Sequence, residues 1–422
     1  MIRTRRNLVF MRRHLGITTA TALLLGLIFV ALGRGNQVSE LHYLSAGYEQ
    51  DLVRWEITHF MDKWVHRVTG PFQDRPSREE AVDAFFALRH DLRDARDELR
   101  HIVVSSEANA TDAQAQVLAI ESERAGMTGT VEEALESAIS GVVNDLGVSD
   151  GVGPLKWPPV DFTFEANGLV LIRSPRDRID RLPDVLLKPD VPLLERIELE
   201  SQVEANDPSL SALVVRIGGV ATYPAQVTPE ASLHRTLEVA SHEWLHHWLF
   251  FQPLGRRIWN GGELTSINET TADIFGEEVG DLALTRLTGE VFDRAPWEPP
   301  TFRRVGEPPD DVFDFTREMR GVRLRLEEIL DDGQMAQAEA FLEKRRLEFV
   351  ANGFDIRKLN TAWFAFNGTY AGGPGSISPI EGQLKTIRAD AGSLAEFLHR
   401  VSQIDEEGEL EEMAQEAGYQ SG

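Results

Sequence analysis

Residues 242–246 read His-Glu-Trp-Leu-His, and they constrain this chain more than any other feature of its sequence. They lie within a stretch of helical apolar spacing that runs from about Glu230 to Phe251. Residues four positions apart on a helix share one face, so His242 and His246 can present their imidazoles to a single metal ion. Glu243 lies about 100° around the helix from His242, which places its carboxylate beside such a metal rather than on it. The sequence therefore predicts a long helix with a metal site on one face.

A second motif follows downstream, where the chain reads Asn268-Glu-Thr-Thr-Ala-Asp273. If this segment is helical, Glu269 and Asp273 share a face. A catalytic zinc ion takes three protein ligands and keeps a fourth position open for water. His242, His246 and Glu269 supply that set. Asp273, one turn farther on, is placed to hold the unligated ring nitrogen of a ligand histidine.

The composition limits the chemistry of any metal site and the class of partner. The chain has 422 residues, enough for roughly two or three domains, and 42% of them are hydrophobic, which is typical of a globular protein. It has no cysteine, so a metal must be held by His, Asp or Glu. Acidic residues outnumber basic ones 68 to 43, giving a formal charge of −25. Such a chain repels phosphate backbones, and we expect no nucleic-acid partner.

The N-terminal residues carry a pattern typical of membrane insertion. Residues 1–14 contain five arginines and no acidic residue, and residues 15–33 contain no charged residue. Nineteen uncharged, mostly apolar residues are about enough to cross the bilayer as a helix. The positive-inside rule then predicts a cytoplasmic basic head, a single-pass transmembrane helix over 15–33 and an extracytoplasmic catalytic domain. The alternative is a cleaved signal peptide, for which Ala31-Leu32-Gly33 is a poor cleavage site.

The fold class predicted for the remainder is α+β and mostly helical. Residues 34–150 show helical apolar spacing and two capping-box patterns, Ser77 with Glu80 and Thr130 with Glu133, so we expect a helical stalk or hairpin there. Residues 151–390 should form a zincin-like domain with a small sheet and the metal-binding helix. Residues 391–422 should form a C-terminal helix and an acidic tail.

The paired motifs resemble those of the gluzincin metallopeptidases, the group that includes thermolysin and neprilysin. The resemblance covers roughly residues 210–280 and is carried by His242-Glu-x-x-His246 and Glu269-x-x-x-Asp273. It implies a zinc cofactor, a peptide or protein substrate and Asp273 bound to His242. It also implies an upstream sheet whose edge strand binds extended peptide, with Ser211–Tyr223 as the candidate. The chain lacks the Gly-x-Met-Glu-Asn signature of the membrane aminopeptidases in that group.

The resemblance also assigns catalytic roles. Glu243 is expected to act as the general base toward a zinc-activated water. Gluzincins stabilise the oxyanion with a Tyr or His from a later segment. We favour Tyr370 for this role because it borders the Gly-rich stretch 368–382, with His399 and Tyr223 as weaker candidates.

Taken together, these features predict a membrane-anchored, zinc-dependent peptidase. One alternative is a catalytically inactive scaffold or receptor with a zinc-binding fold, although degenerate relatives usually lose the base or a ligand, and here all are present. The other is a zinc amidase that acts on a non-protein amide such as peptidoglycan. The sequence indicates neither a cleavage preference nor an oligomeric state.

Overall fold

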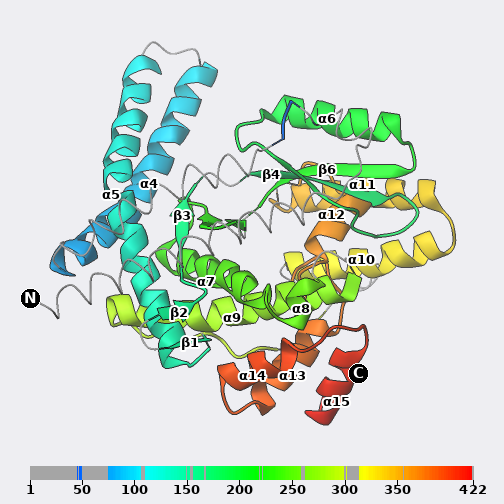
Figure 1. Cartoon of the computed structure of the whole chain (residues 1–422). Helices are drawn as coiled ribbons and strands as arrows, with labels where there is room; N and C mark the ends of the chain where they lie inside the picture. Colours follow the sequence, from blue (N-terminus) through cyan, green and yellow to red (C-terminus); the bar gives the residue numbers. More distant parts are fainter. Residues whose placement is uncertain are drawn as a thin grey trace, which may run out of the picture.

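A computed structural model shows a mostly helical protein with three small sheets among the described residues (Figure 1). The residues that it describes are 45, 47–49, 75–105, 110–148, 150–152, 155–165, 168–217, 219–220, 222–257, 262–298, 301, 313–354 and 356–420.

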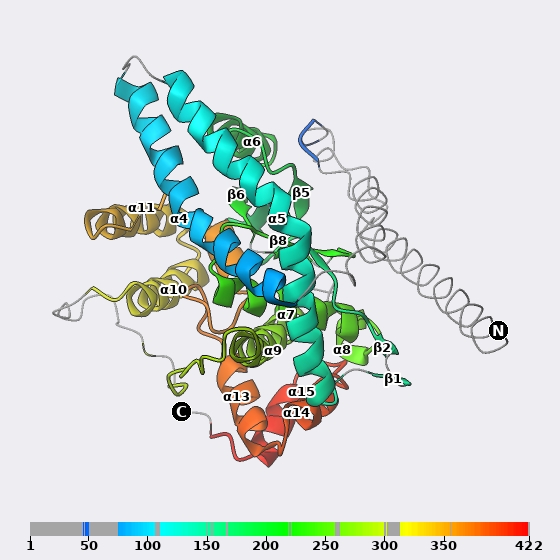
Figure 2. The same cartoon turned by 90° about the vertical axis from the view of Figure 1, so that its left-hand side faces the viewer.

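The first described elements are two long helices, α4 (Arg75–Ser105) and α5 (Ala110–Asp145), which run side by side as a hairpin (Figures 1 and 2). Arg124 of α5 anchors the hairpin to the body of the protein, because its Nη2 donates to the carbonyl of Pro229 at 2.8 Å, in the loop before the helix that carries His242 and His246. The predicted helical hairpin is therefore present over these residues. The predicted helix start at Thr130 is wrong, since that residue lies inside α5.

A three-stranded antiparallel sheet has the order β5-β4-β6. Its strands are β4 (Leu169–Pro175), β5 (Val185–Leu187) and β6 (Leu210–Arg216). Alternate side chains of β4 point to opposite faces, and both faces are covered. Leu169 and Leu171 pack against α6 (Leu193–Asn206), while Val170 and Ile172 pack against α12 (Thr361–Asn367). Burial on both faces explains why β4 is a continuous apolar run rather than an alternating one.

A second three-stranded sheet has the order β3-β8-β7 and lies next to the helix that carries His242 and His246. Its strands are β3 (Phe162–Phe164), β7 (Gly219–Val220) and β8 (Ala225–Val227), and β3 runs parallel to β8. A short antiparallel hairpin of β1 (Asp150–Val152) and β2 (Leu155–Trp157) precedes them. The small sheet expected from the sequence is thus replaced by three separate small sheets among the described residues.

The centre of the protein is the pair α7 (Leu233–Leu249) and α9 (Gly262–Thr288), which the short helix α8 (Pro253–Arg256) connects (Figure 1). Gly276 and Gly280 allow close packing of α7 on α9: a Cβ at Gly276 would lie 2.7 Å from the carbonyl oxygen of Glu238, and one at Gly280 would lie 2.8 Å from its Cγ.

The C-terminal part is helical. Helices α10 (Phe315–Asp331) and α11 (Met335–Ala351) pack on each other, and α12 leads into a loop over 368–379. Helices α13 (Ile380–Asp390) and α14 (Leu394–Val401) then pack on α9, and α15 (Glu409–Glu416) packs on α13. The C-terminal helix expected within residues 391–422 is present as α14, with the Ser393 hydroxyl accepting from the Glu396 N–H as its N-cap, and the expected acidic tail contains a second helix, α15.

The predicted fold class needs one correction. Among the described residues, no helix combines the length and the apolar character needed to cross a membrane. The transmembrane helix expected over 15–33 and the basic head 1–14 fall outside the described residues. The mostly helical character and the small amount of sheet agree with the expectation.

Candidate metal centre

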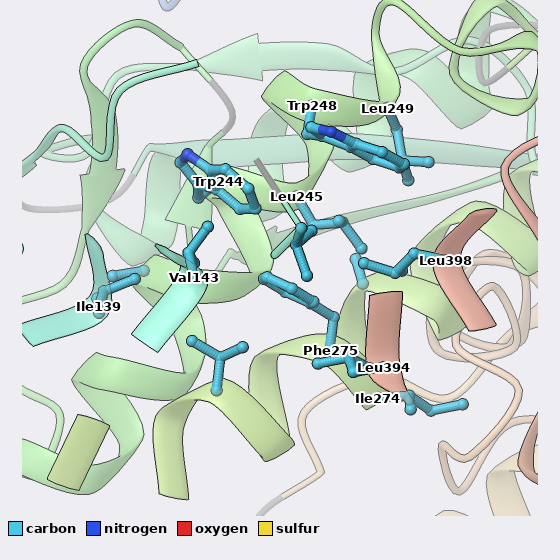
Figure 3. Close-up of a cluster of buried hydrophobic side chains, with 14 of the residues drawn as sticks. Ile139, Val143, Trp244, Leu245, Trp248, Leu249, Ile274, Phe275, Leu394 and Leu398 are labelled. Carbon is cyan, nitrogen blue, oxygen red and sulfur yellow. The ribbon is translucent and has the colours of Figure 1, made fainter. Parts of the chain in front are cut away.

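One side of α7 fixes the helix in the core (Figure 3). Trp244 stacks on Phe275 of α9, with ring centroids 5.5 Å apart, and its Nε1 donates to the carbonyl of Pro158 at 3.0 Å. Leu245 and Leu249 are fully buried in the same cluster. Trp244 and Leu245 project from α7 in directions different from those of His242 and His246. Their packing in the core fixes the rotation of α7 about its axis, and this rotation directs the two histidines toward α9.

The three predicted ligands come together between α7 and α9. The Nε2 atoms of His242 and His246 are 3.0 Å apart, and Oε2 of Glu269 lies 3.5 Å from the first and 3.6 Å from the second. Zinc–ligand bonds of about 2.0–2.2 Å in a tetrahedron place donor atoms roughly 3.3–3.5 Å apart. Two nitrogens and one carboxylate oxygen with these separations fit a zinc ion. The observed triangle therefore needs only small adjustments to hold one.

Each histidine is oriented through its second ring nitrogen. Nδ1 of His242 lies 3.0 Å from Oδ1 of Asp273, the residue chosen from the sequence for this contact. Nδ1 of His246 lies 2.9 Å from Oδ1 of Asn268, which is fully buried. Both contacts leave Nε2 for the metal. No role was expected for Asn268 from its place in the sequence. The signal that could have found it is its position directly before Glu269, because that residue faces the second histidine when the two helices run antiparallel.

Burial acts strongly on the pKa of three ionisable groups of the site, but it decides the direction of the shift only for Glu243. It raises the pKa of Glu243, although the two histidines oppose this effect. Burial also opposes the charged form of His242, but the hydrogen bonds with Asp273 and Glu269 outweigh it and raise the pKa of the imidazole well above its usual value. For Glu269, the attraction of His246 and the hydrogen bonds of both histidines outweigh burial and hold the pKa well below its usual range.

Tyr370 lies near the ligands, unlike the other two oxyanion candidates. The N–H of Ala371 donates to Oγ1 of Thr270 at 3.1 Å, which fixes the chain after Tyr370 to the residue after Glu269. The carboxylate of Glu269 is the largest cause that raises the pKa of the Tyr370 phenol well above its ordinary value, followed by burial.

The alternatives to Tyr370 are placed elsewhere. His399 is exposed on α14. Tyr223 is buried against His247, with ring centroids 5.6 Å apart. Nε2 of His247 lies 2.7 Å from the carbonyl oxygen of Thr222, so this third histidine of the motif region is directed toward the β7–β8 turn.

The candidate peptide-binding strand does not offer a free edge. β6 is an edge strand, but the N–H groups of Ala212 and Val214 donate to the carboxylates of Glu204 and Glu200 at 2.9 and 2.7 Å. The carbonyl of Ala212 accepts from Nδ2 of Asn360 at 3.1 Å. Side chains already satisfy the backbone there, so the expectation of a substrate-binding edge over Ser211–Tyr223 fails at this part of the strand.

A second group of potential ligands consists of His234 and Glu238, upstream of His242 on α7, and Asp281 of α9. Nε2 of His234 lies 2.6 Å from Oδ1 of Asp281, and Arg294 donates to the carboxylates of Glu238 and Asp281. A guanidinium thus fills the space where a cation would bind. We interpret this group as an ion-pair network that ties the segment after α9 to α7.

No protein-family model matches the chain, and the curated proteins and solved structures likewise yielded no match. The resemblance to gluzincins therefore rests on the two motifs.

Proposed function

We propose that this protein is a zinc-dependent peptidase. The observation that carries the proposal is the convergence of His242, His246 and Glu269 within 3.0–3.6 Å, with the second nitrogen of each histidine already held by an acceptor. This is the arrangement of a catalytic zinc site with an open fourth position. A buried carboxylate, Glu243, accompanies it on the same helix.

A zinc ion held by these three residues would polarise the scissile carbonyl and lower the pKa of a water molecule to about 7. Glu243 would take the proton from the attacking water and pass it to the leaving amine. Tyr370 would donate its hydroxyl hydrogen to the developing oxyanion.

The choice of a peptide as substrate is supported by the gluzincin resemblance of the two motifs alone. The same residues suit the hydrolysis of another amide, and an inactive scaffold would need the ligands but not the base. These alternatives are separated by assaying base and ligand variants against a protein substrate and a non-protein amide.

The decisive comparison is between Glu243→Gln and Glu269→Ala. The first variant removes proton transfer at nearly constant volume, so it should keep its zinc, measured by mass spectrometry of the metal, and lose about 10²–10⁴-fold in the cleavage of a denatured protein. The second should lose zinc together with activity, because a ligand is gone. Glu277→Gln, two turns beyond Glu269 on α9 and paired with Lys385 at 3.2 Å, is the control and should keep both zinc and activity.

Three results would contradict the proposal. A purified chain that takes up no zinc would remove its basis. Full activity in Glu243→Gln would reject the assigned base. Cleavage of a peptidoglycan amide but no peptide would replace the peptidase by the amidase.

A further inference from the structure

Arg181 links a loop of the β5-β4-β6 sheet to the segment that carries Tyr370. It lies between β4 and β5, and Nη1 of its guanidinium donates to Oγ1 of Thr369 at 2.9 Å. The Thr369 hydroxyl in turn donates to the carbonyl of Ala365 in α12 at 3.0 Å. Residue 369 is therefore held from two sides, directly before the candidate oxyanion donor.

The guanidinium is itself held in place. Asp184, three residues away, accepts from Nε of Arg181 at 3.2 Å and from its Nη2 at 2.5 Å. Burial disfavours the guanidinium charge, but Asp184 outweighs burial and raises the pKa of Arg181. Two donors on one carboxylate define the direction of the planar group, which leaves Nη1 aimed at Thr369.

A second contact reaches Tyr370 through an aromatic ring. The guanidinium carbon of Arg181 lies 5.2 Å from the centroid of the Phe366 ring. That ring packs edge-on against Tyr370, with centroids 6.4 Å apart. On the other side, Ala371 is tied to Thr270, next to the ligand Glu269. Tyr370 is therefore clamped between Arg181, acting through Thr369 and Phe366, and the metal-binding helix α9.

We propose that Arg181 is a positioning residue that holds Tyr370 beside the metal ligands by fixing Thr369 and supporting the ring of Phe366. This inference rests on the proposed function for its catalytic consequence. Its structural content, the placement of Tyr370, does not depend on which amide is hydrolysed. Asp184 neutralises Arg181, and all three guanidinium nitrogens already donate to Asp184 or Thr369, which favours this role over direct capture of a charged substrate.

The test uses the full zinc-loaded chain and the variants Arg181→Met and Thr369→Val, with Arg178→Met as control. Arg178 lies in the same loop, but its side chain is 61% exposed and pairs with Asp177 and Asp180 at the surface. Arg181→Met and Thr369→Val should lower kcat by up to about 10²-fold with little change in KM or zinc content, because a displaced donor affects the transition state most. The control should match the wild type.

A double-mutant cycle with Tyr370→Phe separates positioning from other effects. If Arg181 acts through the Tyr370 hydroxyl, Arg181→Met should cause no further loss in the Tyr370→Phe background. An equal loss in both backgrounds would overturn the proposal, since Arg181 would then act directly on substrate or on the fold.

A spectroscopic readout keeps the inference testable without catalysis. The chain has 5 tyrosines, so labelling with 3-fluorotyrosine gives few fluorine resonances, and the one lost in Tyr370→Phe identifies residue 370. Arg181→Met and Thr369→Val should shift or broaden that resonance, whereas Arg178→Met should not. An unchanged resonance in both variants would reject the role of Arg181. A wild type that hydrolyses no peptide would reject the proposed function and leave this measurement valid.

Discussion

The Oδ1 atom of Asp273 lies 3.0 Å from Nδ1 of His242 and joins the two motifs of the chain across the α7–α9 interface. Because this contact occupies Nδ1, it directs Nε2 of the imidazole toward His246 and Glu269. The arrangement orients a ligand before any metal binds, which lowers the cost of assembling the site.

Asp273→Asn tests this contact. The amide keeps the size of the side chain but removes the negative charge that makes the imidazole a stronger donor, so zinc affinity should fall by about 10–100-fold. Competition with a chromophoric chelator measures the affinity. The melting temperature at saturating zinc should stay close to that of the wild type. Wild-type affinity and turnover in the variant would show that the contact does not support metal binding.

Asn268 should act on His246 in the same way. Asn268→Leu removes the acceptor at similar volume and should weaken zinc binding by about 10-fold or more, whereas Asn268→Asp keeps an acceptor and should bind zinc more tightly than the leucine variant. Chelator competition on both proteins gives the comparison. Equal affinities of the two variants would mean that the Asn268 oxygen does not orient the ring.

The two close-packed glycines of α9 should be sensitive to a single added carbon. Gly276→Ala would bring a Cβ within 2.7 Å of the Glu238 carbonyl oxygen and 3.1 Å of the His242 Cβ, so α7 and α9 must separate. We expect the free energy of unfolding to fall by about 1–3 kcal/mol and zinc affinity to fall as well. Gly126→Ala in α5 is the control, because an added Cβ there would meet no atom within 4 Å apart from the backbone of its own helix. This substitution should instead raise the free energy of unfolding by about 0.5–1 kcal/mol. Urea unfolding of both variants is the measurement, and an unaffected Gly276→Ala would contradict the tight helix contact.

Asp281 should make stability depend on pH at the acidic end. Burial raises its pKa, but hydrogen bonds from Arg294 and His234 outweigh burial and hold the pKa below its usual value. A lowered folded-state pKa contributes stability above the unfolded value of about 3.9, and this contribution is lost as the pH falls through the folded value. Asp281→Asn should therefore lower the free energy of unfolding near pH 7, and the difference from wild type should shrink below about pH 4. Asp177→Asn, at an exposed ion pair, is the control. A difference that does not vary with pH would assign the effect to packing.

The sequence by itself determined that helix α7 forms and that its two candidate ligands, His242 and His246, share one face. A spacing of four residues and a helical period are local properties of the chain. It also determined that Glu269 and Asp273 share a face. Even the partner of Asp273, inferred from the gluzincin resemblance, is the one that the structure shows. These residues lie on two helices joined by a short connection, so few packing arrangements were available to them.

The tertiary structure decided everything that depends on segments far apart in the chain. Thr270 and Ala371 meet across 101 positions, and Arg181 and Thr369 meet across 188. Neither pair leaves a periodic signal in the sequence, because each depends on how whole elements pack. The side chains of α6 that satisfy β6 are equally invisible to a reading of strand pattern alone. Local periodicity thus specified the ligands of the site, and long-range packing placed Tyr370 beside them and Arg181 against Thr369.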